Sequence, residues 1–192
     1  MADPGFARLV SLACHDLRTP LATVVGFAKT LSRTGALGER EARFVALIEA
    51  AGGQIADLLD RLALAARIEG GRYEPDLVEA DTLELAASAD GRIGAAGRGA
   101  TVRTDAAALR RSLEALALAA LVHGGASAVA WRVEERELAL APVSAGARAV
   151  VTGEAPHDLG ALLARRVIEA LGGSLAVDGE TLRVTLPRSA PA

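Results

Sequence analysis

The sequence contains few aromatic residues and only one cysteine. Aromatic residues make up 3% of the 192 positions, although the apolar fraction reaches 51%. A core with so few rings must be built largely from Leu, Val and Ala, which favours closely packed helices. Cys14 cannot form an internal disulfide by itself, and no cysteine spacing resembles a zinc site. We therefore expect a mainly helical protein suited to a reducing compartment.

The sequence also lacks basic clusters and long apolar runs. Its formal net charge is −3, and no run of Lys or Arg has the density typical of nucleic-acid-binding proteins. No apolar stretch reaches the roughly 18 residues needed to span a bilayer. Asp3 and Pro4 stand where a secretory signal would place basic residues. We expect a soluble, cytoplasmic protein with neither nucleic acid nor a membrane as its partner.

Two long stretches of the chain show helical periodicity. Apolar residues recur every three or four positions, first at Phe6, Leu9, Ala13, Leu17, Leu21, Val24, Ala28 and Leu31, and then at Phe44, Leu47, Ile48, Ala51, Ile55, Leu58, Leu62 and Ala65. Gly35 and Gly38 lie between the two stretches and predict a short turn. The pattern predicts an antiparallel helical hairpin. Its apolar face is too wide to remain in water, so we expect a homodimer whose two hairpins form a four-helix bundle.

The remainder of the chain mixes helices and strands, which makes the fold class α+β. Pro75 marks a boundary and predicts two domains, residues 1–74 and 75–192. The periodicity predicts helices over Ala107–Val122 and Leu159–Leu171. Strands are predicted at Ser127–Val133, Arg136–Leu140, Arg148–Val151, Ser174–Val177 and Thr181–Leu186, the last two as a hairpin.

Individual residues in this second half have simple structural interpretations. Gly94, Gly97 and Gly99 indicate a flexible loop, because no Lys-Ser or Lys-Thr follows to complete a phosphate-binding loop. Asp158 is interpreted as a helix N-cap, and His123 as a residue at the C-terminal end of a helix, favoured there by the helix dipole. We expect Trp131 to pack in the sheet.

The candidate reactive residue is His15, within the first predicted helix. It lies two residues from the apolar positions Ala13 and Leu17, which turns it away from the helix seam and toward solvent. Thr19 is four residues later and shares its face. A neutral imidazole has a free lone pair that can attack phosphorus. The neighbouring Asp16 carboxylate can orient the ring or accept its proton.

The heptapeptide from His15 to Leu21 resembles the phosphoacceptor motif of two-component histidine kinases. That motif has His, an acidic residue, a variable residue, Arg or Lys, Thr, Pro and Leu, and this sequence matches every specified position. Arg18 supplies the basic residue. Pro20 has no N–H, so it would free the Asp16 carbonyl and bend the helix beside the site.

The resemblance to histidine kinases extends through the second predicted helix, at residues 55–60 and 67–71. It implies that His15 receives the phosphoryl group and that Asp16 assists proton transfer. It also implies that Thr19 positions water or the partner during dephosphorylation.

The second half resembles the ATP-binding α/β sandwich of the same family, but in a degenerate form. Residues 98–99, 160–173 and 182–187 and Asp105 resemble the corresponding family segments. The ATP and Mg²⁺ ligands are missing at the aligned positions, which are occupied by Ala115, Ala119, Pro142 and Ser144. The late Gly-x-Gly is replaced by residues 158–160, which begin with an aspartate, and the sequence contains no asparagine. Since Mg-ATP requires oxygen ligands, we expect neither a nucleotide cofactor nor a bound metal.

The sequence thus predicts a dimeric histidine phosphotransfer protein. His15 would exchange a phosphoryl group with a response-regulator receiver domain, and possibly with a histidine kinase, without using ATP. Two alternatives remain: a divergent but active sensor histidine kinase that binds ATP and Mg²⁺ and phosphorylates His15 itself, and a non-enzymatic dimeric scaffold for response regulators.

Overall fold

The computed structural model describes residues 4–35, 37–155 and 157–191. Its contacts divide the chain into two compact units, residues 1–73 and 74–192. Within the described residues, none of the helices combines the length and apolar character needed to cross a lipid bilayer.

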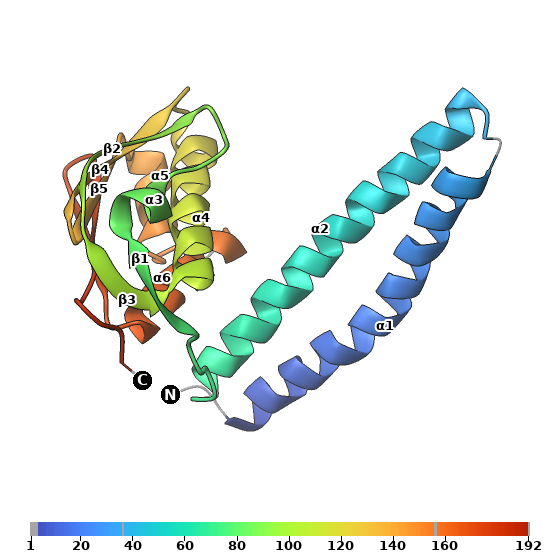
Figure 1. Cartoon of the computed structure of the whole chain (residues 1–192), viewed down its shortest axis with the longest axis horizontal. Helices are drawn as coiled ribbons and strands as arrows, with labels where there is room; N and C mark the ends of the chain where they lie inside the picture. The colour runs from blue at the N-terminus through green and yellow to red at the C-terminus, as the bar shows by residue number, and fades with distance from the viewer. Residues whose placement is uncertain (1–3, 36, 156, 192) are drawn as a thin grey trace. The chain divides into compact units, whose positions relative to one another are not determined.

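The first unit is an antiparallel pair of long helices (Figure 1). Helix α1 spans Pro4–Thr34 and helix α2 spans Glu39–Glu69. Gly35 and Gly38 lie in the connection, as their positions in the sequence predicted. The helical hairpin expected from the apolar periodicity is confirmed.

The two helices meet along a seam of mostly small buried residues. In α2 the buried positions recur every seven residues, at Val45, Gly52, Leu59 and Ala66. In α1 they are Ala7, Cys14 and Ala28. A repeat of seven keeps one narrow stripe of each helix facing the other. At Gly52 the contact is so close that an added Cβ would overlap with Val25 Cγ2.

We expect Gly52→Ala to destabilise the hairpin relative to Gly53→Ala. Both changes gain about 1 kcal/mol of helix propensity. Only the Ala at position 52 meets Val25, whereas a Cβ at position 53 meets no atom within 4 Å. The overlap should leave the Gly52 variant about 1–3 kcal/mol less stable than the Gly53 variant. Amide hydrogen exchange of α2 peptides, at one fixed protein concentration, measures this difference; equal protection would contradict the packing.

Large apolar side chains line a second stripe of the hairpin and remain exposed in the single chain. They are Phe6, Leu9, Leu12, Leu17, Val24, Phe27 and Leu31 on α1, and Phe44, Leu47, Ile48, Ile55, Leu58 and Leu62 on α2. Many of them belong to the stripes that the sequence periodicity identified. Contiguous exposed apolar surface of this kind is unusual in a monomer and marks an interaction site.

The described residues of the second unit form a five-stranded sheet, a two-stranded sheet and four helices. The larger sheet has the order β2-β4-β5-β7-β6, in which β2 and β4 are parallel and the other pairs are antiparallel. The strands are β1 (Leu77–Asp81), β2 (Ile93–Gly99), β3 (Thr101–Asp105), β4 (Val129–Glu135), β5 (Glu137–Ala141), β6 (Ser174–Asp178) and β7 (Thr181–Thr185). The helices are α3 (Thr82–Ala86), α4 (Ala106–Gly124), α5 (Ala145–Val151) and α6 (Leu159–Ala170). Strands β1 and β3 pair to form the smaller sheet.

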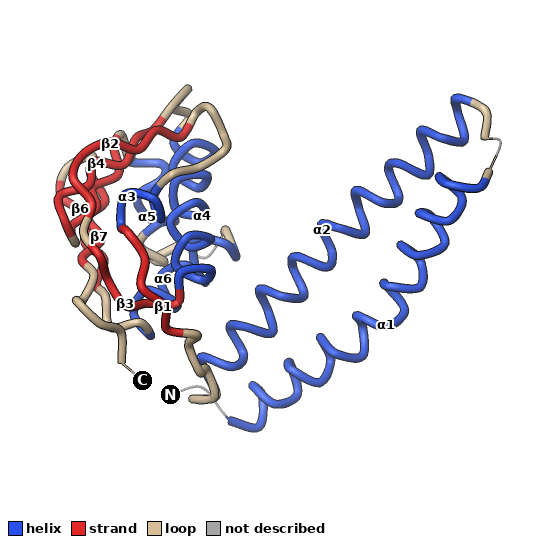
Figure 2. Tube along the Cα trace, viewed as in Figure 1, coloured by secondary structure: helices blue, strands red, loops and turns tan. Residues whose placement is uncertain are grey.

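The helices cover one face of the five-stranded sheet, which gives an α/β sandwich (Figure 2). Along β4, Val129, Trp131 and Val133 are buried, while the alternate Ala130 and Arg132 are exposed. This alternation is typical of a strand with one face on the core. Trp131 is only 1% exposed, so its predicted packing in the sheet is confirmed. The α+β fold class is confirmed as well.

The strand predicted at Arg148–Val151 is wrong, because these residues form the second half of helix α5. A short β-branched run does not distinguish a strand from a buried helix segment. The buried positions of α5 are Ala147, Val150 and Val151, and their spacing of three and four is helical. The segment is therefore helical because one face of α5 packs against the core.

The flexible loop predicted from Gly94, Gly97 and Gly99 is also wrong, because all three belong to strand β2. Strand β2 pairs with β4 along its full length, and this pairing supplies the backbone hydrogen bonds that glycine-rich segments lack by themselves. Gly97 has φ +129, and a Cβ there would overlap the Val133 carbonyl oxygen, so the strand requires a glycine at this position.

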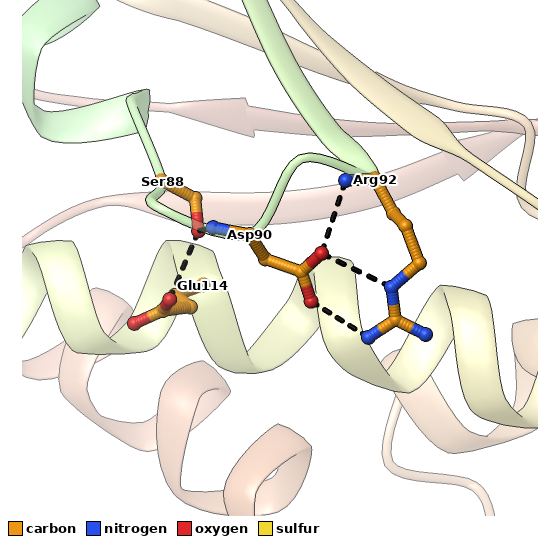
Figure 3. A network of polar contacts seen from close by, with 4 residues as sticks. All are labelled: Ser88, Asp90, Arg92 and Glu114. Atoms are coloured by element: carbon orange, nitrogen blue, oxygen red, sulfur yellow. Dashed lines mark hydrogen bonds and ion pairs between the residues drawn. The ribbon is translucent and has the colours of Figure 1, made fainter.

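A polar network fixes the segment between α3 and β2 (Figure 3). The Asp90 carboxylate accepts hydrogen bonds from the backbone N–H of Arg92 at 3.0 Å and from its Nη2 at 2.6 Å. The Asp90 N–H donates to Ser88 Oγ, and Ser88 Oγ donates to Glu114 Oε1 on α4. The side-chain and backbone hydrogen bonds from Arg92 lower the pKa of Asp90 from 3.8 to about 2.

We expect Asp90→Asn to reduce the urea resistance of the second unit at neutral pH. A carboxyl group whose pKa is lowered by folding stabilises the protein above its unfolded pKa of 3.8, and this stabilisation is lost as the pH falls toward 2. The difference between wild type and variant should therefore shrink across that interval. Fluorescence of Trp131, the sole tryptophan, follows unfolding of this unit. A difference that is unchanged down to pH 2 would contradict the assignment.

Candidate functional site

His15 lies within α1 with its side chain 75% exposed. Its Nδ1 is 3.2 Å from Oδ1 of Asp16, whose side chain is 68% exposed. An ionised carboxylate can only accept a hydrogen bond, so this contact favours the His15 tautomer that carries its proton on Nδ1. The lone pair of Nε2 then faces solvent. The exposure expected from the sequence position of His15 is confirmed.

A surface hollow of about 480 Å³ adjoins the His15 ring. It is lined by His15, Arg18, Thr19, Ala22 and Thr23. The predicted sharing of one face by His15 and Thr19 is thus present in the structure. Ala22 and Thr23 were not identified from the sequence, although their spacing of seven and eight from His15 places them on the same side of the helix.

Arg18 joins α1 to α2 beside this hollow. Its Nη2 donates to Oδ1 of Asp60 at 2.5 Å. Asp60 is 42 residues away in the sequence, and no sequence signal connected it to His15. Pro20 lies inside α1, and the helix continues through it to Thr34.

The four positions aligned with ATP-site ligands lie in and after α4 and β5. Ala119 is fully buried in α4, Ala115 is half-buried, and Pro142 is exposed. Ser144 Oγ donates to the Gly124 carbonyl oxygen at 3.2 Å. Neither a carboxylate nor an amide is present at these positions, and the one hydroxyl is already engaged by the backbone.

A side-chain hydrogen bond links the C-terminal end of α4 to the N-terminal end of α6. His123 Nε2 lies 3.3 Å from Oδ2 of Asp158, and both side chains are 28% exposed. The other oxygen, Oδ1, accepts the Ala161 N–H at 3.0 Å, so the predicted N-cap is confirmed. His123 lies in the last turn of α4, as predicted. The helix N-terminus that could attract an anion is thus occupied by the chain's own carboxylate.

The open face of the five-stranded sheet has a larger hollow, of about 760 Å³, whose lining offers no obvious catalytic residues. Its wall includes Arg132 and Arg183, which pair with Glu134 and Asp178 respectively. Across the residue ranges that the structure describes, no three His, Cys, Asp or Glu side chains gather into a metal-binding group. His15 and its hollow are therefore the strongest candidate for a reactive site.

Comparison with known proteins assigns the first unit. The profile of the His Kinase A (phospho-acceptor) domain matches residues 7–71, which include His15 and both helices. The chain is also 35% identical over 72 residues to histidine protein kinase DivJ of Caulobacter vibrioides. The first unit is therefore a phospho-acceptor domain of the two-component histidine kinase type.

A second curated relative is sensor protein DivL of Caulobacter vibrioides, which is 31% identical to the chain over 78 residues. The matches cover 36% and 41% of the chain, but only 12% of DivJ and 10% of DivL. The similarity to these two proteins is therefore confined to a small part of their length.

Solved structures extend the similarity in fold to the second unit. Full-length ShkA, crystallised in complex with AMPPNP, matches 96% of the chain with a TM-score of 0.69 at 21% identity, and the match covers 46% of ShkA. The histidine kinase AdeS of Acinetobacter baumannii matches 93% of the chain and 98% of its own, with a TM-score of 0.52 at 16% identity. At these identities the comparison establishes the fold of both units.

Proposed function

We propose that the chain is a dimeric histidine phosphotransfer protein of a two-component phosphorelay. His15 accepts a phosphoryl group from a response-regulator aspartate, or from a histidine kinase, and passes it to another carrier. The chain itself does not use ATP.

The geometry around His15 supports its role as the acceptor. Its Nε2 lone pair is directed to solvent because Nδ1 lies beside Asp16. In the transfer, Nε2 forms the bond to phosphorus as the aspartyl P–O bond breaks, and the aspartate carboxylate leaves with the bonding electrons. The Nδ1 proton passes to the Asp16 carboxylate. Thr19 lines the same hollow and is placed to hold water when the phosphoryl group is hydrolysed.

Phosphotransfer is favoured over autophosphorylation by the residues that occupy the ATP-site positions in the second unit. Mg-ATP requires oxygen ligands for its metal and an acceptor for the adenine amine. The aligned positions carry Ala115, Ala119, Pro142 and Ser144, which do not fit those needs. Asp158, which contacts His123, adds a carboxylate at the N-terminal end of α6, where phosphate would approach.

The competing candidate is a divergent kinase that phosphorylates His15 from ATP. It is favoured by the names of the curated relatives, one a histidine protein kinase and one a sensor protein. Incubation of the full chain with radiolabelled ATP, and separately with a radiolabelled phospho-receiver domain, distinguishes the two functions. Label on His15 from the receiver alone supports phosphotransfer. Label from ATP alone, with no other kinase present, would establish the competing function.

The exposed apolar stripe of the hairpin supports a dimer. Phe27 and Ile55 are 68% and 48% exposed in the single chain, as members of a continuous series on α1 and α2. Two such stripes facing one another form the core of an antiparallel four-helix bundle. His15 is on a different face of α1 from the apolar stripe. A bundle formed through that stripe therefore leaves His15 accessible.

A further inference from the structure

Asp60 of α2 is the residue that connects the second helix to the phosphoacceptor face of the first. It accepts a hydrogen bond from Arg18 Nη2 at 2.5 Å. Arg18 is three residues after His15, on the same side of α1, and both line the hollow of about 480 Å³. We infer that Asp60 is a positioning residue for phosphoryl transfer at His15 and that it acts through Arg18. This inference rests on the proposed role of His15 as the phosphoacceptor.

The argument depends on what the Arg18 guanidinium can do while it is held. A guanidinium has several N–H donors in a fixed plane, so a single bond to Asp60 leaves others available for phosphoryl oxygens in the hollow. A cation that is already oriented stabilises the negative charge of a transferring phosphoryl group without reorganising during the reaction. Without Asp60 the long side chain is free to occupy many rotamers, and part of that stabilisation is lost.

A purely structural role explains the pair less well. The Arg18 and Asp60 side chains are 46% and 59% exposed, and exposed ion pairs contribute little to stability. The buried seam from Ala7 to Ala28 and from Val45 to Ala66 already holds the helices together. In contrast, a role in the reaction requires the pair to lie beside His15, and Arg18 lines the same hollow.

The reaction can be measured without a protein partner by using phosphoramidate as the phosphoryl donor. His15 Nε2 forms an N–P bond while the P–N bond of phosphoramidate breaks. Phosphoramidate reacts in its N-protonated form, so that neutral ammonia leaves with the bonding electrons, and the Nδ1 proton of His15 passes to Asp16 or to solvent. Intact mass and peptide mapping of the full-length chain give the maximal labelling rate and the apparent KM for phosphoramidate.

We expect Asp60→Asn and Asp60→Ala to lower the maximal rate about tenfold, the loss typical of one oriented charged contact, with KM changed less than about twofold. Asp60→Glu should restore most of the rate, because it returns the carboxylate. In an Arg18→Gln background, Asp60→Asn should cause no further loss, since the two residues act as one unit. The matched control is Asp57→Asn. Asp57 is exposed one turn earlier on α2, and no ion pair links it to another described residue.

The possible outcomes separate this inference from the proposed function. If the wild type is labelled on His15 but Asp60→Asn keeps the full rate, the inference is wrong and the proposed function stands. An equal loss for Asp57→Asn, or an additional loss in the Arg18→Gln background, also overturns it. If neither phosphoramidate nor a phospho-receiver labels His15 in the wild type, both the proposed function and the inference fail. Circular dichroism of each variant shows that the hairpin remains folded.

Discussion

Replacement of His15 by Gln is expected to abolish phosphoryl transfer. Gln has a similar size and keeps polar atoms, but it has no nitrogen lone pair that can attack phosphorus. Loss of the nucleophile should lower the rate of label uptake from a phospho-receiver domain by at least about 1,000-fold. The folded hairpin should be retained, because the His15 side chain is largely exposed and belongs to neither the seam nor the apolar stripe.

The chain offers a matched control for this experiment in His157→Gln. His157-Asp158-Leu159 repeats the first three residues of the His15 motif but lacks the Arg, Thr and Pro that follow. His157 is also exposed, so general accessibility does not distinguish the two histidines. His157→Gln should be labelled at the wild-type rate. Full labelling of His15→Gln, or equal losses in the two variants, would exclude His15 as the acceptor. If His15→Gln also kept its biological function, a scaffold role would be favoured.

The second large effect is expected from a charge placed in the apolar stripe of the hairpin. In the proposed dimer, Ile55→Asp would bury an unpaired carboxylate in each chain, at a cost of about 3 kcal/mol or more per copy. Because the dimer contains two copies, its dissociation constant should rise at least about 10,000-fold. Sedimentation equilibrium should find twice the chain mass for the wild type and mainly the single chain mass for the variant.

Ala50→Asp provides the control for this dissociation. It adds the same charge to the same helix, at an exposed position about 140° around the helix from Ile55. It should therefore leave the dimer intact. A wild type that remains monomeric at high concentration, or an Ile55 variant that still dimerises normally, would contradict the proposed use of the apolar stripe.

The hairpin was the most predictable part of the molecule. Its helices are long, so that the apolar period repeats many times, and Gly35 and Gly38 interrupt it at the actual turn. The exposure of His15 followed from the same period. The periodicity did not separate the two apolar surfaces of each helix. The seam through Gly52 and the exposed stripe through Ile55 differ by three positions, and only the packing of α1 on α2 distinguishes them.

The second unit was predicted less completely, because its short elements depend on their neighbours. The helices α4 and α6 and the terminal hairpin have enough internal periodicity to be identified. In contrast, β2 is glycine-rich and is a strand because β4 pairs with it, while α5 ends in two β-branched valines and is a helix because one face meets the core. The strands β1 and β3 and the short helix α3 were not predicted from the sequence.

For this protein, local sequence alone determined the heptapeptide from His15 to Leu21, the two long helices of the hairpin and the absence of asparagine from the second unit. These features depend on residue identity and on spacing within a few turns, which a linear sequence records directly. Tertiary structure decided that Asp60 meets Arg18 and that His123 meets Asp158, across separations of 42 and 35 residues. Contacts between distant segments exist only after folding brings two elements together, so no local pattern specifies them.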